Sequence, residues 1–92
     1  MAVWAMIAAA HAASDEAWDE FRKSVEITCL EAAAADLDGA KATVDPFGSQ
    51  SFGLALLQGR PKGGNQPVMM ICVYDKKTRN VELGGEIEAR PP

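Results

Sequence analysis

The chain has 92 residues, of which 48% are hydrophobic and 24% charged, a balance typical of one small globular domain without a large buried pocket. Its formal net charge is −4, and its nine basic residues are scattered along the sequence. Nucleic-acid binding needs clustered Lys and Arg, so no nucleic-acid partner is expected.

Residues 1–12 are predicted to be the remnant of a signal peptide. Ala2 to Ala10 is an apolar run that ends in the arrangement Ala10-His11-Ala12, with small residues where signal peptidase requires them. The run is shorter than the roughly 20 apolar residues that cross a bilayer, so no membrane span is expected in the mature form. Residues 13–92 then form a single periplasmic or secreted domain. Because no basic residue precedes the apolar run, an uncleaved amphipathic or buried helix is the alternative.

A helix is predicted from about residue 15 to residue 37. Ser14 is a suitable N-cap, and two carboxylates follow in the first turn, where they favour the positive end of the helix dipole. Gly39 is a typical stop signal. One narrow apolar arc of this helix is expected to face the core. It consists of Trp18, Phe21, Val25, Cys29 and Ala32.

Beyond Gly39 the pattern changes to short apolar and β-branched runs separated by turn residues. Four strands are predicted, in the segments KATVD, SFGLALLQG, PVMMICVYD and NVELGGEIE. The connections are short, which favours hairpins over crossovers. The predicted fold class is therefore α+β, with one N-terminal helix packed on a three- to four-stranded antiparallel meander sheet.

The two cysteines, Cys29 and Cys72, are predicted to form a disulfide. Cys29 lies on the apolar arc of the helix, and Cys72 lies in mid-strand among the residues assigned to the helix-facing side, which are Val68, Met70 and Tyr74. Two cysteines in a small exported chain permit one pairing, and oxidising compartments favour the bond. Two unpaired buried thiols are the alternative.

No catalytic or metal-binding arrangement is found. Ser49–Gly53 lacks the first glycine of the G-x-S-x-G nucleophile elbow, and the one histidine, His11, lies in the segment predicted to be cleaved. Gly48–Gly53 lacks the Lys and Ser or Thr of a phosphate-binding loop. Met70 and Cys72 share a strand face, as copper ligands would, but are better explained as core residues. We therefore predict no enzyme and no cofactor, and interpret the glycine-rich stretch as a hairpin turn.

Two surfaces are predicted to bind protein. The first is displayed by turns on the disulfide-linked scaffold. Its candidate partner-binding residues are Phe47, Ser49, Gln50, Lys76, Lys77 and Arg79. The second arises because the third predicted strand is apolar on both faces, whereas a single helix covers one, so the other face is predicted to form a homodimer or partner interface. Its candidate residues are Leu57, Met69, Ile71 and Val73. An uncleaved N-terminal helix that covers this face is the alternative.

Between roughly Phe21 and Glu86 the chain combines a helix that carries one cysteine with the segments VDPFGSQSFGLALL and ICVYDKKTR. This combination resembles a set of short uncharacterised exported proteins of alphaproteobacteria, and the resemblance implies export without implying an activity. In architecture, a helix on an antiparallel sheet also resembles cystatin-type inhibitors and small periplasmic regulatory domains. The expected function is a non-enzymatic periplasmic or secreted protein-binding module, such as an inhibitor or an accessory subunit. The alternative is a small-ligand or envelope-sensing domain that binds between helix and sheet.

Overall fold

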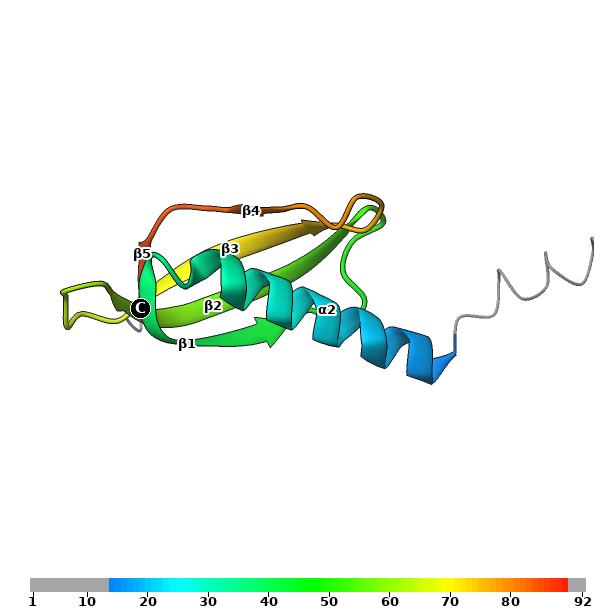
Figure 1. Ribbon diagram of the computed structural model, residues 1–92, viewed down its shortest axis with the longest axis horizontal. Coiled ribbons are helices and arrows are strands. Elements are labelled where there is room, and N and C mark those ends of the chain that lie inside the picture. Colours follow the sequence, from blue (N-terminus) through cyan, green and yellow to red (C-terminus); the bar gives the residue numbers. More distant parts are fainter. Residues whose placement is uncertain (1–13, 90–92) are drawn as a thin grey trace, which may run out of the picture.

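The computed structural model describes residues 14–89, in which a helix packs on an antiparallel sheet (Figure 1). The helix, α2, spans Asp15–Ala33, and the strands are β1 (Leu37–Val44), β2 (Phe52–Pro61), β3 (Val68–Asp75), β4 (Val81–Leu83) and β5 (Ile87–Glu88). The strand order is β1-β2-β3-β4, and β5 pairs with β3 as well. The predicted α+β class, with a helix on an antiparallel meander, is confirmed. The segment predicted to be a signal peptide lies outside the described residues.

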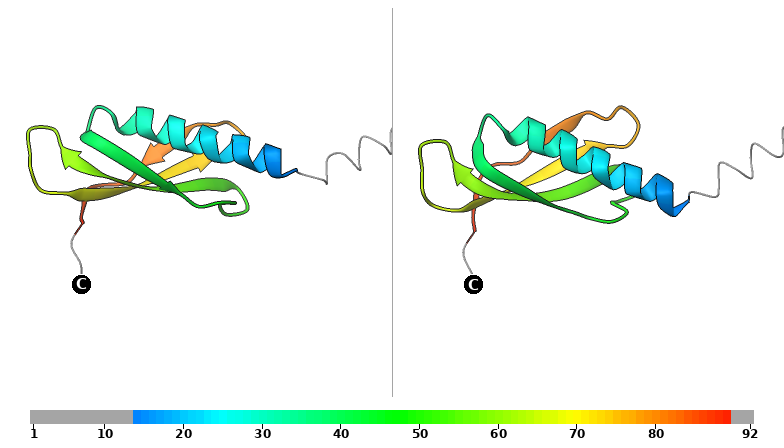
Figure 2. Two further views of the ribbon diagram at one scale, coloured as in Figure 1. Left: turned by 90° about the horizontal axis from the view of Figure 1, so that it is seen from below. Right: turned by 60° about the horizontal axis from the view of Figure 1, so that its bottom comes forward.

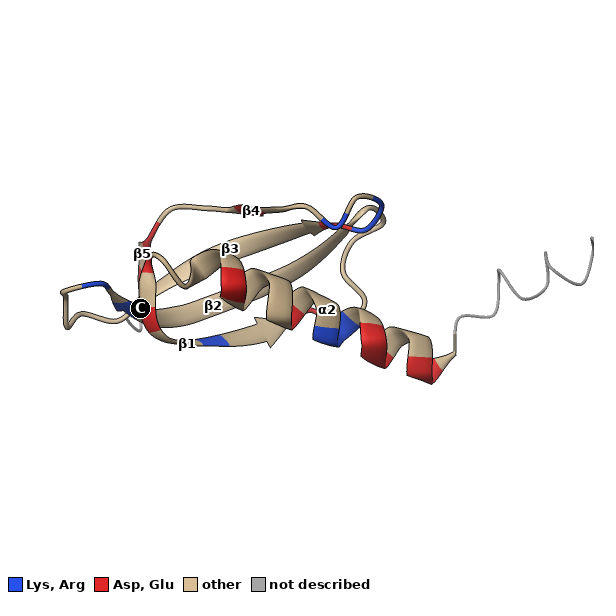
Figure 3. Cartoon of the chain, viewed as in Figure 1, with Lys and Arg blue, Asp and Glu red and all other residues tan. Residues whose placement is uncertain are grey.

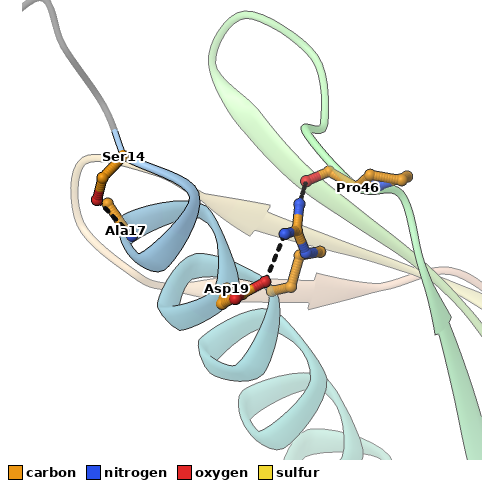
Figure 4. A network of polar contacts seen from close by, with 5 residues as sticks. Ser14, Ala17, Asp19 and Pro46 are labelled. Carbon is orange, nitrogen blue, oxygen red and sulfur yellow. Dashed lines mark hydrogen bonds and ion pairs between the residues drawn. The ribbon is translucent and has the colours of Figure 1, made fainter.

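The start of α2 is set by its N-cap. The Ser14 hydroxyl oxygen accepts a hydrogen bond from the Ala17 backbone N–H over 3.1 Å, as Figure 4 shows. Asp15 and Glu16 follow in the first turn. This bond satisfies one of the N–H groups that the first turn leaves without a helical acceptor. The predicted start is confirmed.

The predicted helix end, by contrast, was wrong. The last helical residue is Ala33, and the Asp36 backbone N–H then donates to the Ala33 carbonyl over 2.9 Å, closing a turn. Leu37 is buried and pairs with Pro61, so it begins β1 instead of continuing the helix. The apolar contact that Leu37 gains in the sheet therefore overrides the helix-favouring alanines that precede it.

Gly39 lies within β1 and does not stop the helix. Its φ is +61°, and the register of β1 against β2 shifts between Asp38 and Lys41, which identifies a β-bulge. The facing residue is also a glycine: a Cβ at Gly59 would lie 3.0 Å from the Asp38 carbonyl oxygen. Gly39 thus provides the left-handed backbone of a bulge, and the close approach of the two strands requires Gly59.

The core lies between α2 and one face of the sheet, an arrangement seen from two sides in Figure 2. The helix contributes Val25, Cys29 and Ala33, so Ala33 takes the buried place expected for Ala32. The predicted helix-facing residues of β3 are all buried: they are Val68, Met70, Cys72 and Tyr74. The predicted disulfide joins Cys29 to Cys72 at the centre of this core, with 6.0 Å between their Cα atoms.

The last predicted strand is divided in two. β4 pairs Leu83 with Cys72, and β5 pairs Ile87 with Met69, so both lie along the same edge of β3. Between them the Gly84 backbone N–H donates to the Ile71 carbonyl over 2.8 Å. The chain therefore keeps contact with β3 while its strand geometry is interrupted by two glycines.

Candidate protein-binding surfaces

The face of the sheet that points away from α2, here called the outer face, is rich in exposed apolar side chains. Alternation along β2 and β3, together with the strand register, assigns its apolar members. They are Phe52, Leu54, Leu56, Met69, Ile71, Val73 and Ile87. Ile71 at the centre is 46% exposed and Ile87 is 47% exposed. No helix or strand of residues 14–89 covers this face (Figure 2).

Three of the four residues predicted for this interface lie on the outer face: they are Met69, Ile71 and Val73. Leu57 does not. It is fully buried beneath α2 and pairs with Met70, which points to the same side. β2 contains two adjacent leucines, Leu56 and Leu57, which point to opposite faces of the sheet. Leu57 shares the helix-facing side with Ala55, so its assignment to the outer face was wrong.

All six candidate partner-binding residues gather at one end of the molecule, here called the loop end. The loop of residues 45–51 and the hairpin of residues 76–80 lie there beside the start of α2 (Figure 1). Figure 3 shows a basic hairpin tip and an acidic helix start, whereas β2 and β3 carry little charge along most of their length. Phe47 is 56% exposed, and Gln50, Lys77 and Arg79 are exposed as well.

Lys76 ties the two loops together. Its ammonium group donates to the Phe47 carbonyl over 2.9 Å and to the Ser49 carbonyl over 2.7 Å. The same nitrogen lies 5.6 Å from the ring centroid of Trp18 and 5.1 Å from that of Phe21, within cation–π range. Lys76 is therefore half-buried and holds the loop in place, instead of being a free cation for a partner.

The helix holds the same loop from the other side (Figure 4). The Arg22 guanidinium donates to the Pro46 carbonyl over 2.9 Å and forms an ion pair with Asp19 over 2.6 Å. Trp18 packs edge to face on Phe47 with 4.9 Å between ring centroids. Sequence reasoning missed the loop-binding role of these helix residues. The only available signal was that Trp18 and Arg22 lie one turn apart near the helix start, which does not identify the loop they contact.

Backbone hydrogen bonds to aspartate side chains shape both loops. Asp45 Oδ1 accepts from the N–H groups of Phe47 and Gly48, over 3.2 and 3.0 Å. Asp75 Oδ1 accepts from those of Lys77 and Thr78, over 2.8 and 3.0 Å. The Thr78 and Lys77 N–H groups stabilise the ionised carboxylate and hold the pKa of Asp75 below its usual value. The two loops are thus built in the same way, as Asx turns.

We expect Lys76→Met to loosen the loop end. The variant keeps most of the apolar stem but loses two charge-assisted hydrogen bonds and the cation–π contacts, so the free energy of unfolding should fall by about 2 kcal/mol. Lys77→Met is the matched control, because Lys77 is exposed and its ammonium makes none of these contacts. Urea denaturation measures the stability, and hydrogen exchange of the Phe52 amide measures local opening. Equal effects of the two variants would contradict the role of Lys76.

A polar pocket of about 350 Å³ lies between α2 and the hairpin of residues 76–80. The hydroxyls of Ser24 and Tyr74 are hydrogen-bonded to each other in its wall over 2.8 Å. The charged residues Lys76, Arg79 and Glu20 also line it. Within residues 14–89 no group of three or more His, Cys, Asp or Glu side chains is arranged to hold a metal ion. Nor does that part of the chain contain a helix long and apolar enough to span a membrane.

No protein-family profile, curated protein or solved structure matches the chain.

Proposed function

We propose that the chain is a non-enzymatic protein-binding module that acts in the periplasm or outside the cell. The observation that carries this proposal is the outer face, a continuous apolar surface over the central strands with Ile71 46% exposed at its middle. Large exposed apolar patches mark protein contact sites, because water contact with such a surface is unfavourable. The partner is another protein or a second copy that forms a homodimer.

The loop end supports the same function with a second contact surface. Phe47 is exposed, yet its loop is held by Lys76 from the hairpin and by Arg22 from the helix. A surface fixed before binding loses less conformational entropy when a partner docks. Small inhibitors and accessory subunits use scaffolds of this kind, and either role is compatible with the proposal.

Two features support export. The Cys29–Cys72 bond is fully buried, and structural disulfides of this kind persist in oxidising compartments. The Ala10-His11-Ala12 arrangement after an apolar run has the form of a signal-peptidase site. We therefore expect mass spectrometry of the protein from its native cell to find an N-terminus near Ala13. Intact Met1 on protein in a soluble cytoplasmic fraction would contradict export.

Photo-crosslinking in the native cell tests protein binding by the outer face. A benzophenone amino acid replaces Ile71 in one variant and Ile27 in the other. The two isoleucines are a matched pair, since Ile71 is 46% exposed on the outer face and Ile27 is 55% exposed on the helix. We expect an adduct of one discrete mass from position 71 and none from position 27. No adduct at position 71, or the same adducts from both positions, would count against the proposal.

A small-ligand or envelope-sensing function is the second candidate. The pocket between α2 and the hairpin favours it, because hydroxyls and two cationic side chains meet there. Native mass spectrometry of the protein purified from its own compartment distinguishes the two functions. A stoichiometric small molecule that is lost in Arg79→Ala supports the sensor, whereas protein free of small molecules supports the protein-binding module.

A further inference from the structure

We propose that the outer face is closed by a second copy of this chain, packed face to face about a two-fold axis that runs across the strands near Leu56 and Ile71. This inference rests on the proposed function, because it names the partner of the same surface. It also specifies which of the possible two-fold arrangements the sheet adopts.

The size of the outer face agrees with a dimer interface. β2 and β3 pair over eight residues, from Phe52 opposite Asp75 to Gly59 opposite Val68. With strands about 4.8 Å apart and a rise of about 3.4 Å per residue, a four-stranded face of that length covers roughly 500 Å². Two such faces amount to about 1,000 Å² when the sheets are treated as flat, and protruding side chains add to this area. The total is close to the lower limit of about 1,200 Å² for specific interfaces. A second copy of the same sheet is therefore about the size needed to cover the patch.

The strand register arranges most of the outer face in three rows that run across the strands, and Phe52 lies beyond them, opposite Asp75. The middle row is Thr43, Leu56 and Ile71. The row on the side of the β2–β3 hairpin is Lys41, Gln58, Met69 and Ile87. The row on the side of the loop end is Asp45, Leu54, Val73 and Glu82. Asp45 belongs here because its N–H donates to the Leu54 carbonyl over 2.8 Å, and it lines a hollow of about 440 Å³ with Leu54 and Ile71.

The charges at the ends of these rows favour an axis across the strands. A rotation about such an axis places the middle row of one copy opposite the middle row of the second copy. It places each outer row opposite the other outer row of the second copy. Lys41 then faces Asp45 of the second copy, and Met69 faces Val73 of the second copy. Asp45 uses Oδ1 for its loop hydrogen bonds, so its second carboxylate oxygen can accept from a lysine.

An axis along the strands is disfavoured by the same charges. It keeps each row opposite itself and reverses the strand order, so Asp45 faces Glu82 of the second copy. Two carboxylates then meet. Either axis places one charged residue opposite Ile87, Glu82 for the axis across the strands and Lys41 for the axis along them, so the Asp45–Glu82 contact is what separates the two arrangements. Rim charges contribute little affinity, but they select orientation, because like charges opposed at an interface are unfavourable.

Cross-linking at one matched pair of threonines tests this arrangement. Thr43 lies on the middle row, next to the axis, so Thr43→Cys residues of two copies face each other across sheets packed about 10 Å apart. Thr78 lies in the hairpin at the loop end, and the proposed axis carries its two copies to opposite ends of the dimer. A bis-maleimide with a reach of about 10 Å reacts with these cysteines only, because Cys29 and Cys72 are buried and bonded to each other.

We expect a covalent dimer from Thr43→Cys and none from Thr78→Cys, in mature protein with the native disulfide intact. Adding Ile71→Lys to Thr43→Cys should reduce the dimer yield at least about tenfold, because the lysine charge would be buried against an apolar row. A dimer from Thr78→Cys alone would overturn the proposed axis. Monomeric wild type at high concentration in sedimentation, with no cross-link at either position, would overturn self-association. A heterologous adduct at position 71 in the native cell would then still support protein binding.

Discussion

Breaking the Cys29–Cys72 bond should lower the free energy of unfolding by about 4 kcal/mol. The two cysteines are 43 positions apart, and a cross-link over a loop of that length removes conformational entropy from the unfolded chain by about this amount. Small domains have a total stability of about 5–15 kcal/mol, so the reduced protein should be marginal at 37 °C. Urea denaturation of oxidised and reduced wild type measures the difference.

Reduction is the cleaner comparison, because it leaves both side chains in place. In the Cys29→Ala/Cys72→Ala double variant both sulfur atoms are missing from a fully buried site, so a packing loss is added to the loss of the cross-link. The double variant should therefore be less stable than reduced wild type. If reduced and oxidised wild type unfold at the same urea concentration, the bond is not the main covalent support of this fold.

Alanine should be far more destabilising at Gly48 than at Gly63. Both glycines have left-handed backbones, with φ of +71° and +77°. A Cβ at Gly63 meets nothing within 4 Å, so Gly63→Ala should cost only the backbone penalty of about 1 kcal/mol. A Cβ at Gly48 would collide with the Phe52 carbonyl oxygen and lie 3.1 Å from the Gly53 Cα, and neither backbone atom can turn aside. We expect Gly48→Ala to cost about 3 kcal/mol or more.

The Gly48 variant also tests how loop shape relates to binding. Moving Phe52 away from Gly48 disturbs the loop whose carbonyls Lys76 holds, while the helix and the central strands keep their own contacts. Hydrogen exchange should therefore show opening at the loop end before the core opens. Similar losses of stability for Gly48→Ala and Gly63→Ala would indicate that the loop rearranges freely around the added methyl group.

Much of the architecture follows from the sequence by itself. The Ser14 cap and its acidic first turn mark the helix start, since capping depends on residues that are neighbours in the chain. Alternation along residues 68–75 predicts which side chains face the helix, because successive residues of a strand point to opposite faces. These two local rules place Cys29 and Cys72 on facing surfaces, and with two cysteines in the chain the pairing follows.

Other features were decided only by contacts between distant parts of the chain. The helix ends at Ala33 because Leu37 pairs with Pro61, and a helix-stop signal at Gly39 carries no information about that pairing. Leu57 is buried because the register of β2 turns Leu57 toward the helix and Leu56 away from it. Two adjacent leucines in the sequence do not indicate which of them faces inward. The sequence predicts Lys76 as a partner-binding residue, yet its ammonium group is held by carbonyls 27 and 29 positions away. Periodicity and capping report on chain neighbours, whereas strand register and loop contacts are chosen by the packing of the whole domain, which no short stretch of sequence contains.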